Sequence, residues 1–161
     1  MTSKQDFLTG ISLYKGNTSE AIVLAAYIQA GFLVSVPFGG GAPYDLIVDT
    51  GTRLLKVQVK TGKLEAGYVI YQAKRHRGSK LNAYSRYTER EVDVFTVWCP
   101  DNRQIYAVPT GMSLTNQVRL RVVEAQNFQE KKIKWARDFT WDIHVANLQT
   151  EKINSELGVS Y

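Results

Sequence analysis

The spacing of apolar residues in the first third of the chain predicts one helix, over about residues 18–30. Apolar side chains recur there every three or four positions, which places them on one face of a helix. Asn17 and Glu20 have the spacing of an N-terminal capping box, and Gly31 favours the left-handed conformation that ends many helices. The apolar stripe of this helix comprises Val23, Leu24, Tyr27 and Ile28.

Six short runs rich in β-branched and aromatic residues follow, and each predicts a strand. The third run alternates apolar and polar side chains, so that Lys56, Gln58 and Lys60 share the face opposite the apolar one. Only a Thr-Gly-Thr turn separates the second run from the third, which predicts a hairpin. The fifth run is apolar almost throughout, as in a strand covered on both faces. The six runs are residues 32–38, 44–49, 54–61, 68–74, 93–99 and 104–108.

The pattern weakens beyond residue 110, where one helix is predicted around residues 128–139. The C-terminal part carries apolar side chains that we expect to pack back on the core or against a second subunit. These side chains are Trp141, Ile143, Val145 and Leu148. A helix, then strands, then further helix is the order of an α/β domain. The chain is therefore predicted to form a mixed central β-sheet flanked by helices.

Composition narrows the class of protein. The chain has 161 residues, of which 44% are hydrophobic, and this is enough to bury the core of one compact domain. It contains no apolar run of the roughly 18 residues that a membrane span needs, and its first residues lack the apolar core of a signal peptide. We therefore expect a cytoplasmic protein without a membrane partner. The single cysteine, Cys99, excludes an internal disulfide and is predicted to be a buried thiol.

Positive charge is concentrated in one segment. Lys and Arg number 20 against 15 Asp and Glu, and residues 74–90 are dominated by Lys and Arg, with Glu89 as their only acidic residue. A solvated loop is one interpretation, and a nucleic-acid contact is the other, because clustered cations pair with phosphates. Two tyrosines, Tyr84 and Tyr87, lie among these cations, where they are able to pack on sugars or bases. The predicted DNA contacts are Lys74, Arg75, Arg77, Lys80 and Arg86.

Three polar side chains are predicted to converge on the hairpin. Asp45 opens its first strand, and Gln58 and Lys60 leave the second strand on one face. Such groups are costly to bury unless they are paired or bound to a metal. A carboxylate, an amide and an ammonium group suit metal-assisted attack of water on a phosphodiester. Glu20 lies on the apolar stripe of the helix and is expected to face the same site, unless it serves only the capping box.

The sequence at this point resembles the PD-(D/E)XK nuclease superfamily, and within it the small endonucleases associated with bacterial group I introns. The resemblance covers about residues 16–110 and rests on GNTSEAIVLAAYIQAGFLVSVPFGGGAPYDLIVD, LLKVQVKTG and REVDVFTVWCPDNRQIYAVPT. It implies a restriction-endonuclease-like core, with Asp45 as the metal-binding aspartate and Lys60 as the catalytic lysine. Glu20 matches the accessory helix glutamate, and Gln58 occupies the position of the second acid. The implied cofactor is Mg²⁺, with Mn²⁺ as a substitute, held by Glu20, Asp45 and Gln58.

The sequence departs from the family pattern at two positions. The first motif reads Pro-Tyr-Asp, so the proline stands one residue further from Asp45 than usual. Gln58 is neutral where aspartate or glutamate is usual, which lowers the negative charge available to hold a cation. The resemblance to the intron-associated enzymes implies that glutamine is compatible with activity here. Asp49, on the same strand face as Asp45, is a possible substitute ligand.

These observations predict a Mg²⁺-dependent, site-specific endonuclease of the homing type that cuts double-stranded DNA. One chain carries one predicted site, so cutting both strands predicts a homo-oligomer, a dimer or a tetramer. Residues 1–112 are interpreted as the nuclease core and residues 113–161 as an extension that packs on it or forms subunit contacts. Three alternatives remain open at this point. They are a Holliday-junction resolvase, a DNA-binding module whose nuclease site has decayed, and a metal-independent RNA-processing nuclease.

Overall fold

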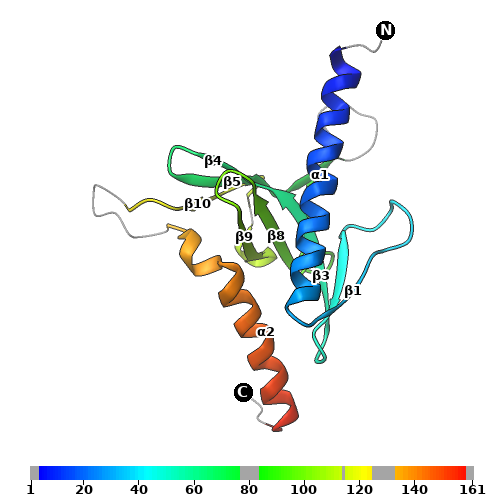
Figure 1. Ribbon diagram of the computed structural model, residues 1–161, viewed down its shortest axis with the longest axis vertical. Helices are drawn as coiled ribbons and strands as arrows, with labels where there is room; N and C mark the ends of the chain where they lie inside the picture. Colours follow the sequence, from blue (N-terminus) through cyan, green and yellow to red (C-terminus); the bar gives the residue numbers. More distant parts are fainter. Residues whose placement is uncertain (1–3, 77–83, 114, 125–132, 159–161) are drawn as a thin grey trace.

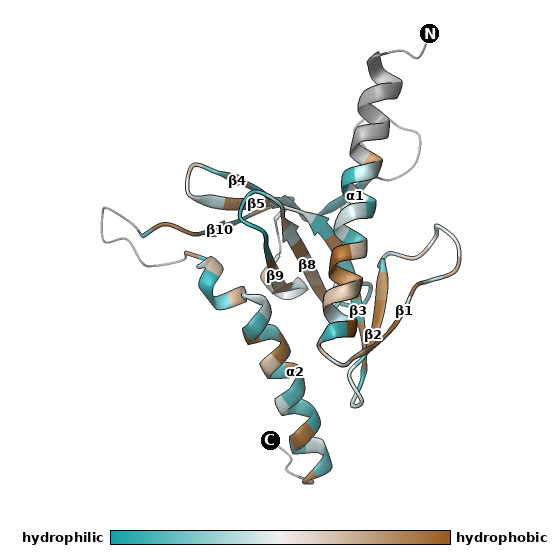
Figure 2. Cartoon of the chain, viewed as in Figure 1, coloured by the Kyte–Doolittle hydropathy of each residue, from teal (hydrophilic) through white to brown (hydrophobic). Residues whose placement is uncertain are grey.

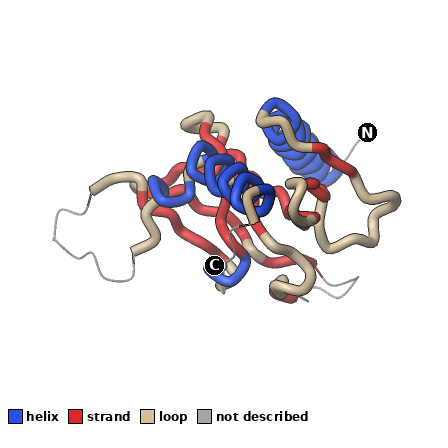
Figure 3. Tube along the Cα trace, turned by 90° about the horizontal axis from the view of Figure 1, so that it is seen from below, coloured by secondary structure: helices blue, strands red, loops and turns tan. Residues whose placement is uncertain are grey.

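A computed structural model describes residues 4–76, 84–113, 115–124 and 133–158. The chain forms three layers (Figure 1). Two helices, α1 (Lys4–Gln29) and α2 (Trp141–Glu156), lie on the same side of the strands (Figure 3). A five-stranded sheet forms the middle layer, and a three-stranded sheet covers part of its other face. The mixed sheet therefore lies between the two helices on one side and the smaller sheet on the other.

The central sheet has the strand order β1-β2-β3-β8-β9. Only β3 and β8 pair in parallel, and the other neighbours are antiparallel, so the sheet is mixed, as the sequence predicts. The third predicted strand, residues 54–61, has the predicted bounds, whereas the first is reduced to three residues. The strands are β1 (Leu33–Ser35), β2 (Leu46–Asp49), β3 (Leu54–Thr61), β8 (Val94–Cys99) and β9 (Gln104–Pro109).

Alternating side chains give the central sheet two different faces. On β3, Leu55, Val57 and Val59 belong to the core cluster that includes residues of α1 and α2. On β8, Val94 faces that same cluster, while Phe95 packs in the second cluster beneath the small sheet. This strand is therefore covered on both faces, which explains its nearly unbroken apolar sequence. Figure 2 shows the contrast between the hydrophobic β8 and the largely hydrophilic α2.

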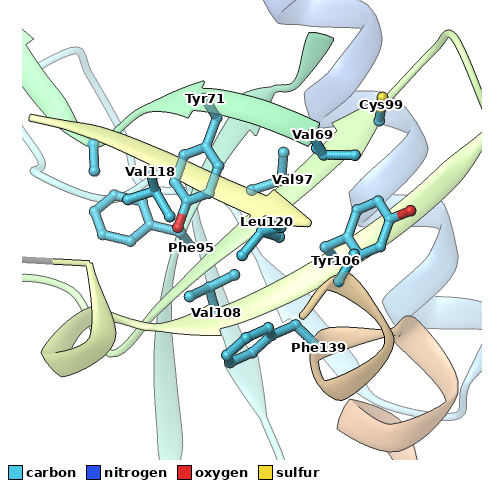
Figure 4. Packing of buried hydrophobic residues seen from close by; sticks show 12 residues of the cluster. Val69, Tyr71, Phe95, Val97, Cys99, Tyr106, Val108, Val118, Leu120 and Phe139 are labelled. Carbon is cyan, nitrogen blue, oxygen red and sulfur yellow. The ribbon is translucent and has the colours of Figure 1, made fainter. Parts of the chain in front are cut away.

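The small sheet has the strand order β10-β5-β4. Its strands are β4 (Lys63–Glu65), β5 (Tyr68–Gln72) and β10 (Gln117–Arg121). One face carries Val69, Tyr71, Val118 and Leu120, which pack on side chains of β8 and β9 (Figure 4). The predicted strand 68–74 divides at Ala73, whose amide donates to Asn116 (2.9 Å), and the chain continues into a separate two-stranded ribbon. That ribbon consists of β6 (Lys74–His76) and β7 (Tyr84–Arg86).

The first helix begins much earlier than the sequence predicts. Asn17 lies inside α1, so the predicted capping box with Glu20 is wrong. The hydroxyls of Thr18 and Ser19 donate instead to the carbonyls of Tyr14 (2.7 Å) and Lys15 (3.1 Å), four residues back. These bonds let polar residues continue the helix where they resembled a cap. The predicted stop is confirmed, because Gly31 has a φ of 88°.

The C-terminal part differs from the prediction in one element. Residues 133–139 form no α-helix but a short 3-10 turn at Ala136–Phe139, so the predicted helix is wrong there, and residues 128–132 lie outside the described part. The predicted packing of the C-terminal apolar residues is largely confirmed, because Leu148 is 2% exposed and Trp141 and Val145 contact the same core cluster. Ile143 is the exception, with 43% of its surface exposed.

Two further expectations concern single features of the chain. Cys99 is a free, fully buried cysteine, as the sequence predicts. Its thiol has a raised pKa because burial disfavours the thiolate, which agrees with a structural role rather than a nucleophilic one. Among the described helices, none is both long and apolar enough to cross a membrane.

A half-buried histidine, His144, makes the stability of α2 packing depend on pH. The Nε2 atom of His144 lies 2.9 Å from the hydroxyl of Tyr27, and burial lowers the pKa of His144 to about 4. The unfolded chain, with a histidine pKa near 6.5, therefore takes up a proton first as the pH falls. The free energy of unfolding is expected to decrease by about 3 kcal/mol between pH 6.5 and 4 for this reason. Urea unfolding of the wild-type protein and of His144→Gln across this range checks the prediction, and parallel pH dependences would contradict it.

Candidate active site

The hairpin of β2 and β3 sets the position of the predicted site. Leu46 pairs with Val57, so Asp45 lies opposite Gln58 at the entrance to the hairpin. The amide of Asp45 donates to the carbonyl of Val57 at 2.9 Å, which continues the ladder by one residue. The other end is closed by a tight turn in which Gly51 has a φ of 84°. The predicted hairpin is confirmed, and it brings Asp45 to the polar face of β3.

The Asp45 carboxylate is held by its neighbours on β3. Its Oδ2 atom accepts hydrogen bonds from the Val59 amide (2.7 Å) and from the side-chain amide of Gln58. Burial raises the pKa of Asp45, while these two hydrogen bonds and the nearby Lys60 ammonium act in the opposite direction. Both bonds fall on one oxygen, and among the described residues Oδ1 accepts none. This second oxygen is the one that is left to bind a ligand.

The ammonium group of Lys60 interacts with the carboxylates of Asp45 and Glu20. Burial lowers its pKa, and the carboxylates of Asp45 and Glu20 partly offset that effect. Its Nζ atom lies 3.3 Å from the hydroxyl of Tyr87 and 5.0 Å from the centre of that ring. A lysine with a lowered pKa releases its proton more readily than a solvated one, as a general base requires.

Glu20 reaches the site from α1. The pKa of Glu20 is raised by burial and then by the negative charge of Asp45, while Lys60 lowers it. The helix is fixed at this point by the hydroxyls of Ser19 and Thr61, which lie 2.7 Å apart. Glu20 is nevertheless exposed, and Ile28 of the predicted stripe is 54% exposed. Glu20 therefore lies at the solvent-exposed edge of the site, and its carboxyl interacts with both Asp45 and Lys60.

Tyr87 is a site residue that the sequence did not assign to catalysis. Its ring packs on Phe95 at 5.4 Å between centres, and the guanidinium of Arg75 lies 5.5 Å above it. Burial, with the charge of Asp45, raises the pKa of Tyr87 to about 12, so its hydroxyl is protonated. The sequence placed Tyr87 among DNA contacts, since no local pattern indicates a partner 27 residues away at Lys60.

The predicted DNA contacts have different environments. Arg75 forms an ion pair with Glu91 at 2.6 Å and is half-buried, so it supports the ribbon beneath Tyr87. Lys74 is half-buried in β6. Arg86 is exposed, and its Nε atom donates to Asn116 at 3.4 Å. Arg77 and Lys80 lie outside the described residues.

The donor set of the site fits a hard divalent cation. The neighbouring negative charges of Glu20 and Asp45 repel each other, which raises the pKa of Glu20. A cation bound between the two carboxylates would relieve that repulsion. Mg²⁺ is commonly bound by only one or two carboxylates, with water or phosphate completing its coordination. No cluster of three His, Cys, Asp or Glu side chains occurs in the described ranges. Gln58, hydrogen-bonded to Asp45 through its amide nitrogen, carries a neutral amide oxygen of the kind that Mg²⁺ accepts as a ligand. Asp49 does not contribute, because its carboxylate accepts from the Gly51 amide (2.8 Å), about 13 Å along the strand from Asp45.

Comparison with known proteins agrees with this geometry. The family model of the PD-(D/E)XK endonuclease matches residues 12–142, which is most of the chain. The chain belongs to the PD-(D/E)XK endonuclease family. The family assigned from the sequence is thereby confirmed, and with it a nuclease function at the coarse level.

One solved structure supports the restriction-endonuclease-like fold. The bacterial homing endonuclease I-Ssp6803I superimposes with a TM-score of 0.69 and 24% sequence identity, over 88% of this chain and 96% of that one. At this identity the similarity establishes the fold, which confirms the predicted fold class. Among curated protein sequences, none matches the chain.

Proposed function

We propose that this PD-(D/E)XK nuclease is a Mg²⁺-dependent, site-specific endonuclease of the homing type that cuts double-stranded DNA. The observation that carries the proposal is the convergence of Glu20, Asp45, Gln58 and Lys60, from a helix and two strands, on one partly buried site. The likeness to a bacterial homing endonuclease supports this substrate class. Mn²⁺ is proposed as a substitute metal.

The residues of the site have different proposed roles in hydrolysis. Glu20, Asp45 and the amide oxygen of Gln58 hold the cation, which supplies positive charge to the scissile phosphate when it is bound. Gln58 also fixes the Asp45 carboxylate through its amide nitrogen. Lys60 accepts the proton of the attacking water, because burial lowers its pKa and makes the neutral amine easier to reach than in a solvated lysine. Tyr87 holds the Lys60 amine toward the phosphate through its hydroxyl and ring.

The same proposal extends to DNA contacts and assembly. Arg86, Lys74 and Arg75 belong to the ribbon that carries Tyr87 into the site, and we assign this ribbon, with Arg77 and Lys80, to contacts with the phosphate backbone and base edges. Each chain supplies one such centre, and cutting both strands requires a second copy. We therefore propose a homo-oligomer, a dimer or a tetramer, with subunit contacts supplied by part of residues 113–161.

Gln58 is expected to set a balance between stability and metal binding. Gln58→Glu places a second carboxylate against Asp45, where Gln58 is only 8% exposed, and removes the amide hydrogen bond. The metal-free variant is expected to lose about 2 kcal/mol of stability, a fall in Tm of about 4–8 °C. Saturating Mg²⁺ is expected to restore most of the Tm, because the cation offsets the added charge. Thermal unfolding with and without Mg²⁺ measures this, and Gln58→Met, which loses stability without regaining it in Mg²⁺, is the control.

The proposed function is tested by comparing three DNA substrates. The protein is incubated with supercoiled plasmid and host-genome duplex containing a single recognition site, and with a synthetic four-way junction, each with Mg²⁺ or with EDTA. Discrete duplex fragments that require Mg²⁺ support a homing-type endonuclease. Preferential cutting of the junction would favour the resolvase alternative, and salt-sensitive binding without any cleavage would favour the decayed module.

A further inference from the structure

Three arginines and two aromatic residues are joined by successive cation–π contacts, across the small sheet and the segment 135–137 beside it. Arg119 lies 5.4 Å from the ring of Tyr68, and Arg121 lies 5.4 Å from that same ring. Arg121 also lies 5.9 Å from the ring of Trp135, and Arg137 lies 4.6 Å from that ring. We name this row, Arg119-Tyr68-Arg121-Trp135-Arg137, the arginine ladder.

The ladder occupies the outer face of the small sheet. Val118 and Leu120 point into the core, so the alternating residues Arg119 and Arg121 point to the opposite side. The amide of Arg121 donates to the carbonyl of Lys134 at 2.8 Å, which aligns residues 134–137 beside β10. In Figure 1, β4, β5 and β10 extend to the side of the central sheet that lies away from β1. Tyr68 and Arg121 pair at one end of the small sheet, whereas the ribbon that leads to Tyr87 continues from the other end, after Gln72.

The positive charge of the ladder is not neutralised within the described part of the chain. Three ion pairs occur there, and none includes a ladder arginine. Arg121 donates to neutral groups, the Val123 carbonyl at 2.8 Å and the Tyr68 hydroxyl at 3.1 Å. Glu65 is close enough to Arg119 for its pKa to be affected, but its hydrogen-bonded partner is Lys63 (2.8 Å). The stacked guanidinium groups are thus held in place while retaining their net charge.

We propose that the arginine ladder binds the phosphate backbone of duplex DNA, at a distance from the scissile phosphate. Guanidinium groups stacked on aromatic rings have already lost much of their conformational freedom, so binding costs less entropy than with solvated arginines. Three neighbouring positive groups suit a partner with closely spaced negative charges, such as the phosphates of a DNA strand. This inference rests on the proposed DNA substrate and adds a second contact surface, outside the basic segment 74–90.

The test replaces two exposed arginines of the ladder and measures DNA binding under conditions in which no cleavage occurs. Arg119→Gln/Arg137→Gln is compared with the wild-type protein on a 40-bp duplex of arbitrary sequence in EDTA, by fluorescence anisotropy over a range of NaCl concentrations. Arg53→Gln/Lys152→Gln is the matched control, because it removes the same net charge near the opposite end of β3 from Lys60. Thermal unfolding verifies that both variants are folded. Arg121 is left intact because its bonds close the end of β10.

The ladder variant is expected to bind DNA roughly ten- to thirtyfold more weakly near 150 mM salt. The negative slope of log K against log salt is expected to become shallower by about 0.9 for each lost phosphate contact. The control variant is expected to stay within a few-fold of the wild-type protein. Equal losses in the two double variants would overturn the inference while leaving the proposed function intact. Unchanged DNA binding with a fall in oligomer mass, measured by light scattering, would overturn it in favour of a contact between copies. A wild-type protein that binds no duplex would overturn the proposed function itself, and this inference with it.

Discussion

Lys60→Met is expected to slow DNA cleavage by about a thousandfold, because it removes the amine that we propose as the acceptor of the proton from the attacking water. DNA affinity is expected to stay within a few-fold, since one buried amine contributes little to a large contact surface. Lys56→Met is the matched control. Lys56 lies on the same strand and face, but its amine donates to the Arg90 carbonyl outside the site, so the cleavage rate should remain near the wild-type value.

The proposed role of Lys60 as a proton acceptor predicts the direction in which the cleavage rate changes with pH. Burial lowers the pKa of Lys60, so the neutral amine is populated at lower pH than for a solvated lysine. Burial raises the pKa of Asp45, so that carboxylate is protonated, and the cation is lost, at higher pH than for a solvated aspartate. The rate at fixed Mg²⁺ should therefore rise with pH from the acid range through neutrality. Single-turnover rates at several pH values measure this, and a wild-type rate that falls as the pH rises above 7 would contradict a proton-accepting Lys60.

Asp45→Asn is expected to abolish metal uptake and to slow cleavage by about a thousandfold, equivalent to about 4 kcal/mol of transition-state stabilisation. The asparagine oxygen still accepts the Val59 amide, so the fold should be preserved, and loss of activity then reports on the charge. Binding of Mn²⁺ followed by electron paramagnetic resonance, with cleavage in parallel, provides the measurement.

Asp49→Asn is the matched control for this prediction. Asp49 belongs to the same strand as Asp45, but its carboxylate accepts from the Gly51 amide at the turn. Metal uptake and cleavage by this variant are expected to match those of the wild-type protein. A variant at Asp49 that loses the metal, while Asp45→Asn retains it, would move the metal site to the other end of the hairpin.

The parts of the fold that were predictable from sequence are those in which the local residue pattern is compatible with only one type of secondary structure. The strict alternation of β3 fixed its bounds and its two faces, and the apolar run of β8 indicated a strand covered on both sides. The start of α1 was not predictable, because Thr18 and Ser19 form the same type of local hydrogen bond inside a helix as at its end. β4 and β10 were missed because each is short and is stabilised by pairing with β5.

The candidate site likewise contains residues that the sequence predicted and residues that it did not. Asp45, Gln58 and Lys60 were found because a hairpin brings near neighbours in sequence onto one face. Tyr87 was not assigned to the site because its contact with Lys60 depends on how the ribbon of β6 and β7 packs on Phe95. The arginine ladder was also missed, because it joins β5, β10 and residues 135–137, which only the tertiary fold brings together.

The central claim is that this nuclease cleaves DNA through a divalent cation held beside Lys60, and metal depletion with readdition tests it most directly. Protein stripped with EDTA and dialysed is mixed with supercoiled plasmid carrying host DNA, and Mg²⁺, Mn²⁺ or Ca²⁺ is then added back. Nicked and linear products are expected only after Mg²⁺ or Mn²⁺ is restored, and Asp45→Asn is expected to form them about a thousandfold more slowly than the wild-type protein. Equal cleavage in the metal-free protein, or by Asp45→Asn, would contradict the claim.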